Sequence, residues 1–290
     1  MTAFSRPRRR LAAILCSLSA LLLTGTAAQA ATPPGPHHPA TASGVEYVAL
    51  GDSYSSGLGA GAYDPASDEC MRSSHAYPAR WAAAHAVTSF RFTACSGATT
   101  GDVIGSQLGP LTNRTDLVSI TAGGNDAGFG DVMTTCVTSP EKTCLAKVAG
   151  ARSFVTSTLP GRLDTLYRTI RDRAPGARVV VLGYPRLYHL NGRCVVGLSE
   201  RARTAIDEAE ETLNRLMAER AAGHGFRFGD VNATFAGHEI CSSAPWIHSV
   251  TLPPQESYHP TDNGHRYGYL PVFTAQAAEA GRASTRPVSR

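Results

Sequence analysis

The sequence lacks several features that mark other classes of protein. Its longest apolar segment, Leu11 to Leu23, is shorter than the roughly 20 residues that a membrane-spanning helix requires. Its cysteines form no CxxC pair and its ten histidines are scattered, which argues against a zinc site. No segment is repeated along the chain. We therefore expect neither a stable membrane anchor, nor a metal, nor a repeat architecture.

An excess of charge of one sign is also missing once the N-terminus is set aside. Four of the 27 basic residues (Arg6, Arg8, Arg9 and Arg10) lie in the first 30 residues, which contain no acid. The other 23 basic residues equal the 23 acidic ones in number. The sequence therefore gives no reason to expect nucleic-acid binding.

The N-terminal segment is typical of a secretion signal. The arginines precede the apolar core, and "AQA" at Ala28 to Ala30 supplies the small residues that a signal peptidase requires. We predict a signal peptide over 1–30, a flexible leader over 31–43, one folded domain over 44–280 and a flexible tail over 281–290. The protein is accordingly expected outside the cell.

Six cysteines follow the signal segment: Cys70, Cys95, Cys136, Cys144, Cys194 and Cys241. An even number in an exported chain predicts disulfides, although six cysteines allow 15 pairings. Free thiols in the core are the alternative.

Short apolar runs alternate with segments of helical period in the rest of the chain. The expected strands are 45–50, 90–92, 117–121, 179–183 and 226–228. One helix should present Leu163, Leu166, Tyr167 and Ile170 on a single face, and a longer one should present Ile206, Ala209, Leu213 and Leu216, with Ser199 as its cap. This alternation predicts an α/β fold with a parallel sheet covered by helices on both sides.

Polar loops that contain glycine follow the first three strands. Ser53 follows the first, Gly97 lies in the loop after the second, and Asn125 follows the third. Since functional residues of parallel sheets lie beyond the carboxyl ends of the strands, these three residues should lie at one edge. Each has a structural alternative: Ser53 as a helix cap, Gly97 as a turn glycine and Asn125 as a turn residue.

A base for Ser53 is available near the C-terminus, where "ESYHP" places Glu256 three residues before His259. Serine ester hydrolysis needs a nucleophile, a base, a group that orients the base, and donors for the oxyanion. His265 is a rival base, but on a following helix it would lie on another face. Asp52, beside Ser53, is expected to fix its loop rather than to react. The chain contains no GxSxG, so the ordinary α/β-hydrolase nucleophile turn is excluded.

The combination "GDSYSSG" (51–57), "CSGA" (95–98), "GGND" (123–126) and the terminal His-Pro resembles the GDSL, or SGNH, hydrolases. It is most similar to their secreted actinobacterial lipase and esterase branch, from Val45 to Phe273. The resemblance implies a three-layer α/β/α sandwich with five parallel strands. It also implies Ser53 as nucleophile, His259 as general base, and an oxyanion hole made of the Ser53 and Gly97 N–H groups and the Asn125 side chain.

The resemblance further implies the disulfides Cys70–Cys95, Cys136–Cys144 and Cys194–Cys241. The family usually has Asp where this chain has Glu256, and some members use a backbone carbonyl instead of the acid. We predict that the Glu256 carboxylate orients His259, with a carbonyl as the alternative.

The expected reaction is hydrolysis of carboxyl esters of lipids through an acyl-enzyme on Ser53, without a cofactor and by a monomer. Residues 136–144 and 230–258 are expected to form loops over the site. Apolar residues of the second loop either contact an acyl chain or only pack the loop: Phe235, Ile240, Trp246, Ile247 and 250–254. A carbohydrate acetylesterase and a catalytically inactive binding module are the alternative functions.

Overall fold

The structure is a computed structural model that describes residues 44–192, 194 and 197–278. The predicted signal peptide, leader and tail (1–30, 31–43 and 281–290) lie outside the described residues. Among the helices of the described part, none is both long and apolar enough to cross a membrane.

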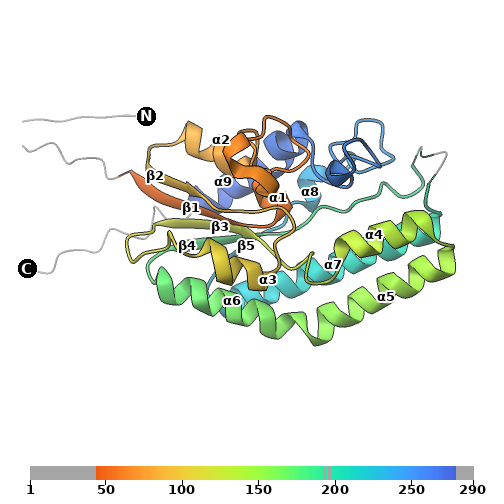
Figure 1. Cartoon of the computed structure of the whole chain (residues 1–290), viewed down its shortest axis with the longest axis horizontal. Coiled ribbons are helices and arrows are strands. Elements are labelled where there is room, and N and C mark those ends of the chain that lie inside the picture. The colour runs from red at the N-terminus through yellow and green to blue at the C-terminus, as the bar shows by residue number, and fades with distance from the viewer. Residues whose placement is uncertain (1–43, 193, 195–196, 279–290) are drawn as a thin grey trace, which may run out of the picture. The chain divides into compact units, whose positions relative to one another are not determined.

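Five parallel strands form the central sheet, as predicted (Figure 1). The strand order is β2-β1-β3-β4-β5. The bounds are β1 Val45–Gly51, β2 Val87–Phe92, β3 Leu117–Thr121, β4 Arg178–Leu182 and β5 Arg227–Gly229. All five residues of β3 are buried, and so are the four apolar residues of β4. Continuous apolar runs suit central strands because helices cover both faces of such a sheet.

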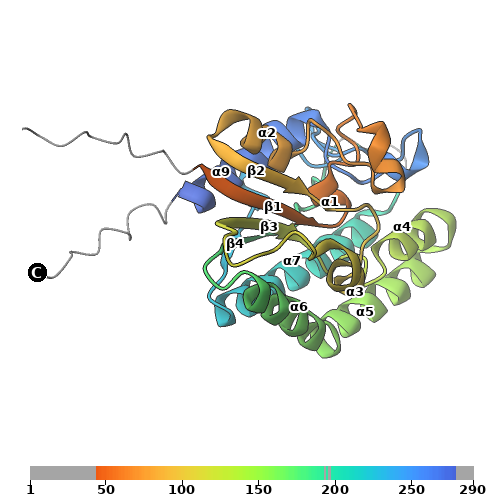
Figure 2. The same cartoon turned by 60° about the vertical axis from the view of Figure 1, so that its left-hand side comes forward.

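Helices cover both faces of the sheet and give three layers (Figure 2). One layer contains α1 (Ser53–Ser56), α2 (Tyr77–Ala84), α8 (Asn232–Phe235) and α9 (Leu270–Ala278). The other contains α3 (Thr100–Asp102), α4 (Phe129–Thr138), α5 (Glu141–Ser157), α6 (Leu159–Arg173) and α7 (Glu200–Gly223). Short helical turns are η1 (Pro65–Cys70), η2 (Val103–Gln107), η3 (Pro254–Glu256) and η4 (Gly264–Tyr269).

The two helices expected from sequence periodicity are present with their predicted faces. In α6 the four predicted apolar residues are fully buried. In α7 the Oγ of Ser199 accepts a hydrogen bond from the backbone N–H of Ala202 (3.2 Å), which confirms the predicted cap. Burial of these apolar faces against the sheet supplies most of what holds each helix in place.

The segment 136–144 differs from the predicted loop. Cys136 belongs to α4 and Cys144 to α5, and only Ser139 and Pro140 separate the two helices. Proline favours the start of a helix because its fixed φ suits the first turn, so this Ser-Pro pair joins two helices. The disulfide Cys136–Cys144 ties the helices together at this end. The other disulfides are Cys70–Cys95 and Cys194–Cys241, which is the pairing implied by the resemblance.

Candidate active site

The turn after β1 places Ser53 at the start of α1. Gly51 has φ +119°, and a Cβ there would lie 2.4 Å from the carbonyl oxygen of Thr121, so glycine is required. Asp52 caps α1 by accepting a hydrogen bond from the N–H of Tyr54 (3.0 Å). Ser53 is thus the first residue of the helix, with its side chain held in a buried position.

The carboxylate of Asp52 fixes this turn, as predicted. It also accepts hydrogen bonds from the Thr121 hydroxyl (2.6 Å) and the Tyr184 hydroxyl (2.5 Å). The Tyr184 hydroxyl in turn accepts from the N–H of Gly124 (3.2 Å), next to Asn125. Burial raises the pKa of Asp52 to about 6, although these donors oppose the shift. Asp52 therefore joins the loops after β1, β3 and β4.

His259 contacts Ser53 across the carboxyl edge of the sheet. Its Nε2 lies 2.8 Å from the Ser53 Oγ, and its Nδ1 lies 2.9 Å from the carbonyl oxygen of Ser257. Since a carbonyl only accepts, Nδ1 carries the proton and Nε2 can accept the proton of the serine. Burial lowers the pKa of His259 to about 4, so the ring is neutral at neutral pH.

Backbone and aromatic contacts hold His259 in this position. The Tyr54 hydroxyl donates to the carbonyl oxygen of Tyr258 (2.6 Å), and the Tyr54 ring packs against the imidazole. Gly59 has φ +91°, and a Cβ there would lie 3.0 Å from the Cβ of His259. The loop after α1 can therefore approach the histidine only because residue 59 is glycine.

The expected contact between Glu256 and His259 is not formed. Glu256 instead accepts a hydrogen bond from the Tyr63 hydroxyl (2.6 Å), which itself accepts from the N–H of Gly59 (2.9 Å). The carbonyl of Ser257 occupies the position that the carboxylate was predicted to take. The geometry therefore corrects the predicted role of Glu256: it fastens its loop to the loop after the first helix.

The loops after β2 and β3 bring the other two predicted residues to the same edge. The Nδ2 of Asn125 donates one hydrogen bond to the carbonyl of Ala98 (3.0 Å). An amide nitrogen carries two N–H donors, so the second remains available for a ligand. Gly97 has φ +79°, and a Cβ there would meet open space. Asp126 joins the two loops by accepting from the N–H and hydroxyl of Thr100 (2.8 and 2.7 Å).

His265 lies in another environment. Its Nδ1 accepts a hydrogen bond from the N–H of Tyr77 (3.3 Å), and its ring stacks near Tyr77 and Tyr269. Burial lowers its pKa to about 3. These contacts make it a packed core residue rather than a base for Ser53.

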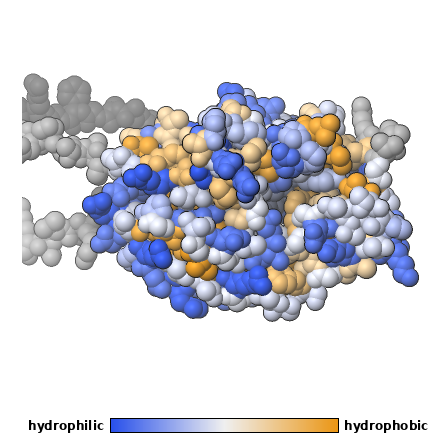
Figure 3. Space-filling view, viewed as in Figure 1, coloured by the Kyte–Doolittle hydropathy of each residue, from blue (hydrophilic) through white to orange (hydrophobic). Residues whose placement is uncertain are grey.

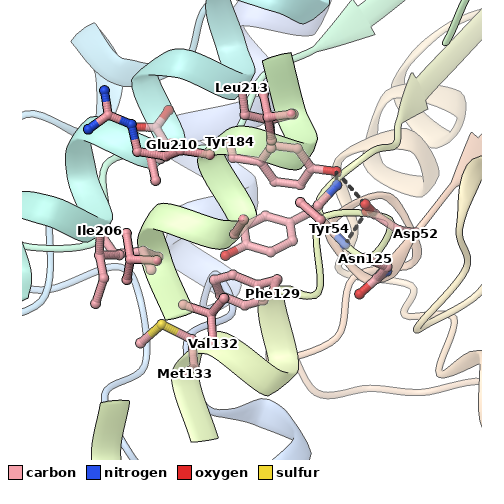
Figure 4. Close-up of a pocket in the computed structure, with 18 of the residues that line it drawn as sticks. Asp52, Tyr54, Asn125, Phe129, Val132, Met133, Tyr184, Ile206, Glu210 and Leu213 are labelled. Carbon is pink, nitrogen blue, oxygen red and sulfur yellow. Dashed lines mark hydrogen bonds between the residues drawn. The ribbon is translucent and has the colours of Figure 1, made fainter. Parts of the chain in front are cut away.

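An apolar cavity with Ser53 among its lining residues lies between α4, α5 and α7 (Figure 4). Tyr54 and Tyr184 line it on the side of Asp52 and Asn125. Its apolar wall consists of Ala127, Phe129, Val132, Met133, Val148, Ala151, Val155, Pro185, Leu187, Ile206, Ala209 and Leu213. We call this space, which Ser53 lines, the acyl cavity.

Glu210 is a polar residue of the acyl cavity wall, as are Asp52, Asn125 and Arg152. Burial raises its pKa to about 8, so the carboxyl is mostly protonated at neutral pH. Its Oε2 is buried and makes no hydrogen bond to the described part of the chain. Sequence reasoning missed this residue, although its position between Ile206 and Leu213 on α7 places it on the predicted apolar face.

The apolar residues expected over the site from 230–258 do not line this cavity. Phe235, Ile240 and Ile247 are buried in the core, whereas Val250 and Leu252 are exposed. For the buried three, the alternative that they pack their own loop is the one observed. The acyl cavity is formed by residues of α4, α5 and α7 instead.

Comparison with known proteins agrees with the arrangement of the site. A model of the GDSL-like Lipase/Acylhydrolase family matches residues 49–267. The chain is 58% identical over 269 residues to a lipase from Streptomyces rimosus, covering 92% of this chain and 99% of the relative.

Two solved structures each cover 80% of this chain with 99% of their own and a TM-score of 0.79. They are an extracellular lipase from Streptomyces rimosus, 62% identical, and a phospholipase A1 from Streptomyces albidoflavus NA297, 58% identical. The chain belongs to the GDSL-like lipase/acylhydrolase family and is a carboxylic ester hydrolase.

Proposed function

We propose that the protein is a secreted lipase that hydrolyses long-chain carboxyl esters through an acyl-enzyme on Ser53. The observation that carries this proposal is the 2.8 Å contact of a neutral His259 with Ser53, which lines the acyl cavity. The N-terminal signal pattern and the similarity to an extracellular lipase support secretion. We further propose that the protein acts as a monomer.

In the first half of the reaction His259 acts as general base. Its Nε2 takes the proton of Ser53 as the Oγ attacks the ester carbonyl, and the imidazolium then protonates the leaving alcohol. Nδ1 keeps its proton throughout, held by the carbonyl of Ser257. A water molecule then repeats the sequence at the acyl-enzyme and releases the fatty acid.

The oxyanion is stabilised by three donors. The N–H groups of Ser53 and Gly97 donate no hydrogen bond within the described residues, and Asn125 has a second N–H in addition to the one given to Ala98. These donors are fixed before substrate arrives, because the Asp52–Tyr184–Gly124 contacts and the Asp126–Thr100 contacts join their loops. Such preorganisation is what makes donors effective in a transition state.

The acyl cavity favours a long acyl chain over an acetyl group. Its wall is mostly apolar, and Glu210, the carboxyl that α7 contributes to it, is mostly neutral at neutral pH. Transfer of each CH₂ group from water to such a wall is favourable by about 0.8 kcal/mol. An acetyl ester would leave most of this surface unused, which counts against the acetylesterase alternative.

The test is hydrolysis of p-nitrophenyl esters from C2 to C16 by the native protein and an Ala151→Trp variant. Ala151 lines the cavity from α5, so the larger side chain should block the far part of the cavity. We expect kcat/KM to rise with chain length in the native protein. In the variant, kcat/KM for long-chain esters should be at least about tenfold lower than in the native protein, whereas kcat/KM for short-chain esters should be unchanged.

Ala149→Trp is the matched control, because Ala149 is an exposed residue of the same helix. It should leave the chain-length profile unchanged. A native profile that peaks at C2, or an Ala151→Trp profile that matches the native one, would contradict the proposed acyl site.

A further inference from the structure

A surface loop beside the active site exposes large apolar side chains. Leu252 is 85% exposed and Val250 is 64% exposed, although both belong to residue types that are usually buried. They lie in the segment Ser249 to Gln255, which contains no charged residue. We call this segment the apolar tip.

The apolar tip is anchored directly at the catalytic histidine. At its base the N–H of His248 donates to the carbonyl of His259, and the N–H of Tyr258 donates to the carbonyl of His248 (both 2.9 Å). Closer to the tip the N–H of Thr251 donates to the Ser257 hydroxyl (3.0 Å). These hydrogen bonds fix the loop, and its exposed apolar residues lie close in sequence to His259, the general base.

A third exposed apolar residue lines the same surface hollow as the tip. Val137, at the end of α4, is 48% exposed and lines this hollow together with Val250, Tyr188 and Tyr258. Glu141 and Arg203 also line it, and each is paired with an opposite charge. Figure 3 shows hydrophobic surface on the right-hand side, where Figure 1 places the loop before η3 and the end of α4. α4 also contributes Phe129, Val132 and Met133 to the acyl cavity, so one helix borders both the hollow and the cavity.

We propose that the apolar tip and Val137 form a docking surface for the lipid aggregate itself, which inserts Val250 and Leu252 among acyl chains and holds the active site at the lipid surface. This inference rests on the proposed lipase function. Exposed apolar groups favour transfer into an acyl phase in proportion to the area that leaves water. Because the tip is uncharged and the two charged residues of the hollow are of opposite sign, the surface fits neutral or zwitterionic lipid, and salt should have little effect on binding.

The experiment measures sedimentation of the Ser53→Ala protein with vesicles of diether phosphatidylcholine, which the enzyme cannot cleave. The variant pair Val250→Ser/Leu252→Ser should lower the vesicle partition coefficient by at least about tenfold. It should lower the hydrolysis of phosphatidylcholine vesicles by the active enzyme to a similar extent. Its kcat/KM for soluble p-nitrophenyl butyrate should stay within about twofold of the native value.

Tyr267→Ser is the matched control, since Tyr267 is 47% exposed but lines neither the acyl cavity nor the hollow at the tip. It should change neither vesicle binding nor hydrolysis. A Leu252→Trp variant gives a second readout that does not depend on loss of function. Its added tryptophan emission should shift to the blue and be quenched by brominated lipid when vesicles are added.

The proposal would be overturned if the Ser pair bound vesicles as well as the parent protein does. It would also be overturned if the emission spectrum of Leu252→Trp did not change when vesicles are added. The proposal would also be overturned if the Ser pair self-associated less than the native protein in the absence of lipid, because a second copy of the chain would then be the occupant of the surface. The proposed lipase function fails by a different result, namely a native protein that binds vesicles but hydrolyses no soluble ester.

Discussion

Replacing Glu256 by Gln should leave the catalytic rate almost unchanged. Glu256 contacts Tyr63 rather than His259, and the Nδ1 of His259 is already bonded to the Ser257 carbonyl at 2.9 Å. Gln can still accept the hydrogen bond of Tyr63, so the loop should keep its position. We therefore expect kcat to stay within about twofold, whereas neutralising a true triad acid costs up to ~10⁴.

The pH profile supplies an independent readout of the same substitution. Burial lowers the pKa of His259 to about 4, so kcat/KM for a soluble ester should fall only as the pH approaches that value. A carboxylate that stabilised the imidazolium would raise this pKa, and its removal would move the acid limb to lower pH. We expect the acid limb of Glu256→Gln to coincide with that of the native protein.

The matched control is Asp262→Asn, which removes an acid three residues after His259 that pairs with Arg80. It should behave like Glu256→Gln in kcat. A loss of more than about 100-fold in Glu256→Gln alone would refute the assignment of the Ser257 carbonyl and restore Glu256 as the group that orients the base.

Three further substitutions test other parts of the account. Asn125→Ala should lower kcat by about 10²–10³ because it removes one oxyanion donor, with little effect on folding although the bond to Ala98 is also lost; an unchanged kcat would show that Asn125 has only a structural role. Tyr184→Phe should lower the free energy of unfolding by about 1–3 kcal/mol in denaturant titrations, because Asp52 and Gly124 lose a buried hydrogen-bond partner. A variant as stable as the native protein would show that these hydrogen bonds do not stabilise the fold. Glu210 has a folded-state pKa of about 8 against an ordinary value of 4.5, so the folded state retains a proton that the unfolded state releases between those values. Its stabilising contribution is thus lost as the pH rises through that window, and Glu210→Gln should show a smaller decline of melting temperature from pH 5 to pH 8 than the native protein; parallel declines would argue against the raised pKa.

The sheet and the loops at its carboxyl edge could be predicted because the signals are local. Val179 to Leu182 form an uninterrupted apolar run, and only a strand covered on both faces buries such a run completely. The turn at Gly51 follows from a positive φ that glycine alone adopts easily. Parallel strand order then brings the ends of β1, β2 and β3 to one edge without further information.

The partner of His259 could not be predicted, because every residue offers a backbone carbonyl and sequence does not distinguish them. Spacing pointed to the Glu256 side chain, but whether that side chain or the Ser257 carbonyl reaches Nδ1 depends on the dihedral angles of one turn. The acyl cavity was missed for a related reason. Ser139 and Pro140 resemble a loop signal in isolation, yet they join two helices whose packing against α7 creates the cavity.

The most direct test of the account is covalent labelling with a long-chain alkyl fluorophosphonate followed by peptide mass mapping. We expect one adduct per molecule, on Ser53, formed with loss of activity and much faster than with a methyl analogue because the chain occupies the acyl cavity. His259→Ala should slow labelling strongly while the protein remains folded. An adduct on another serine, or labelling that is indifferent to His259, would contradict the proposed mechanism.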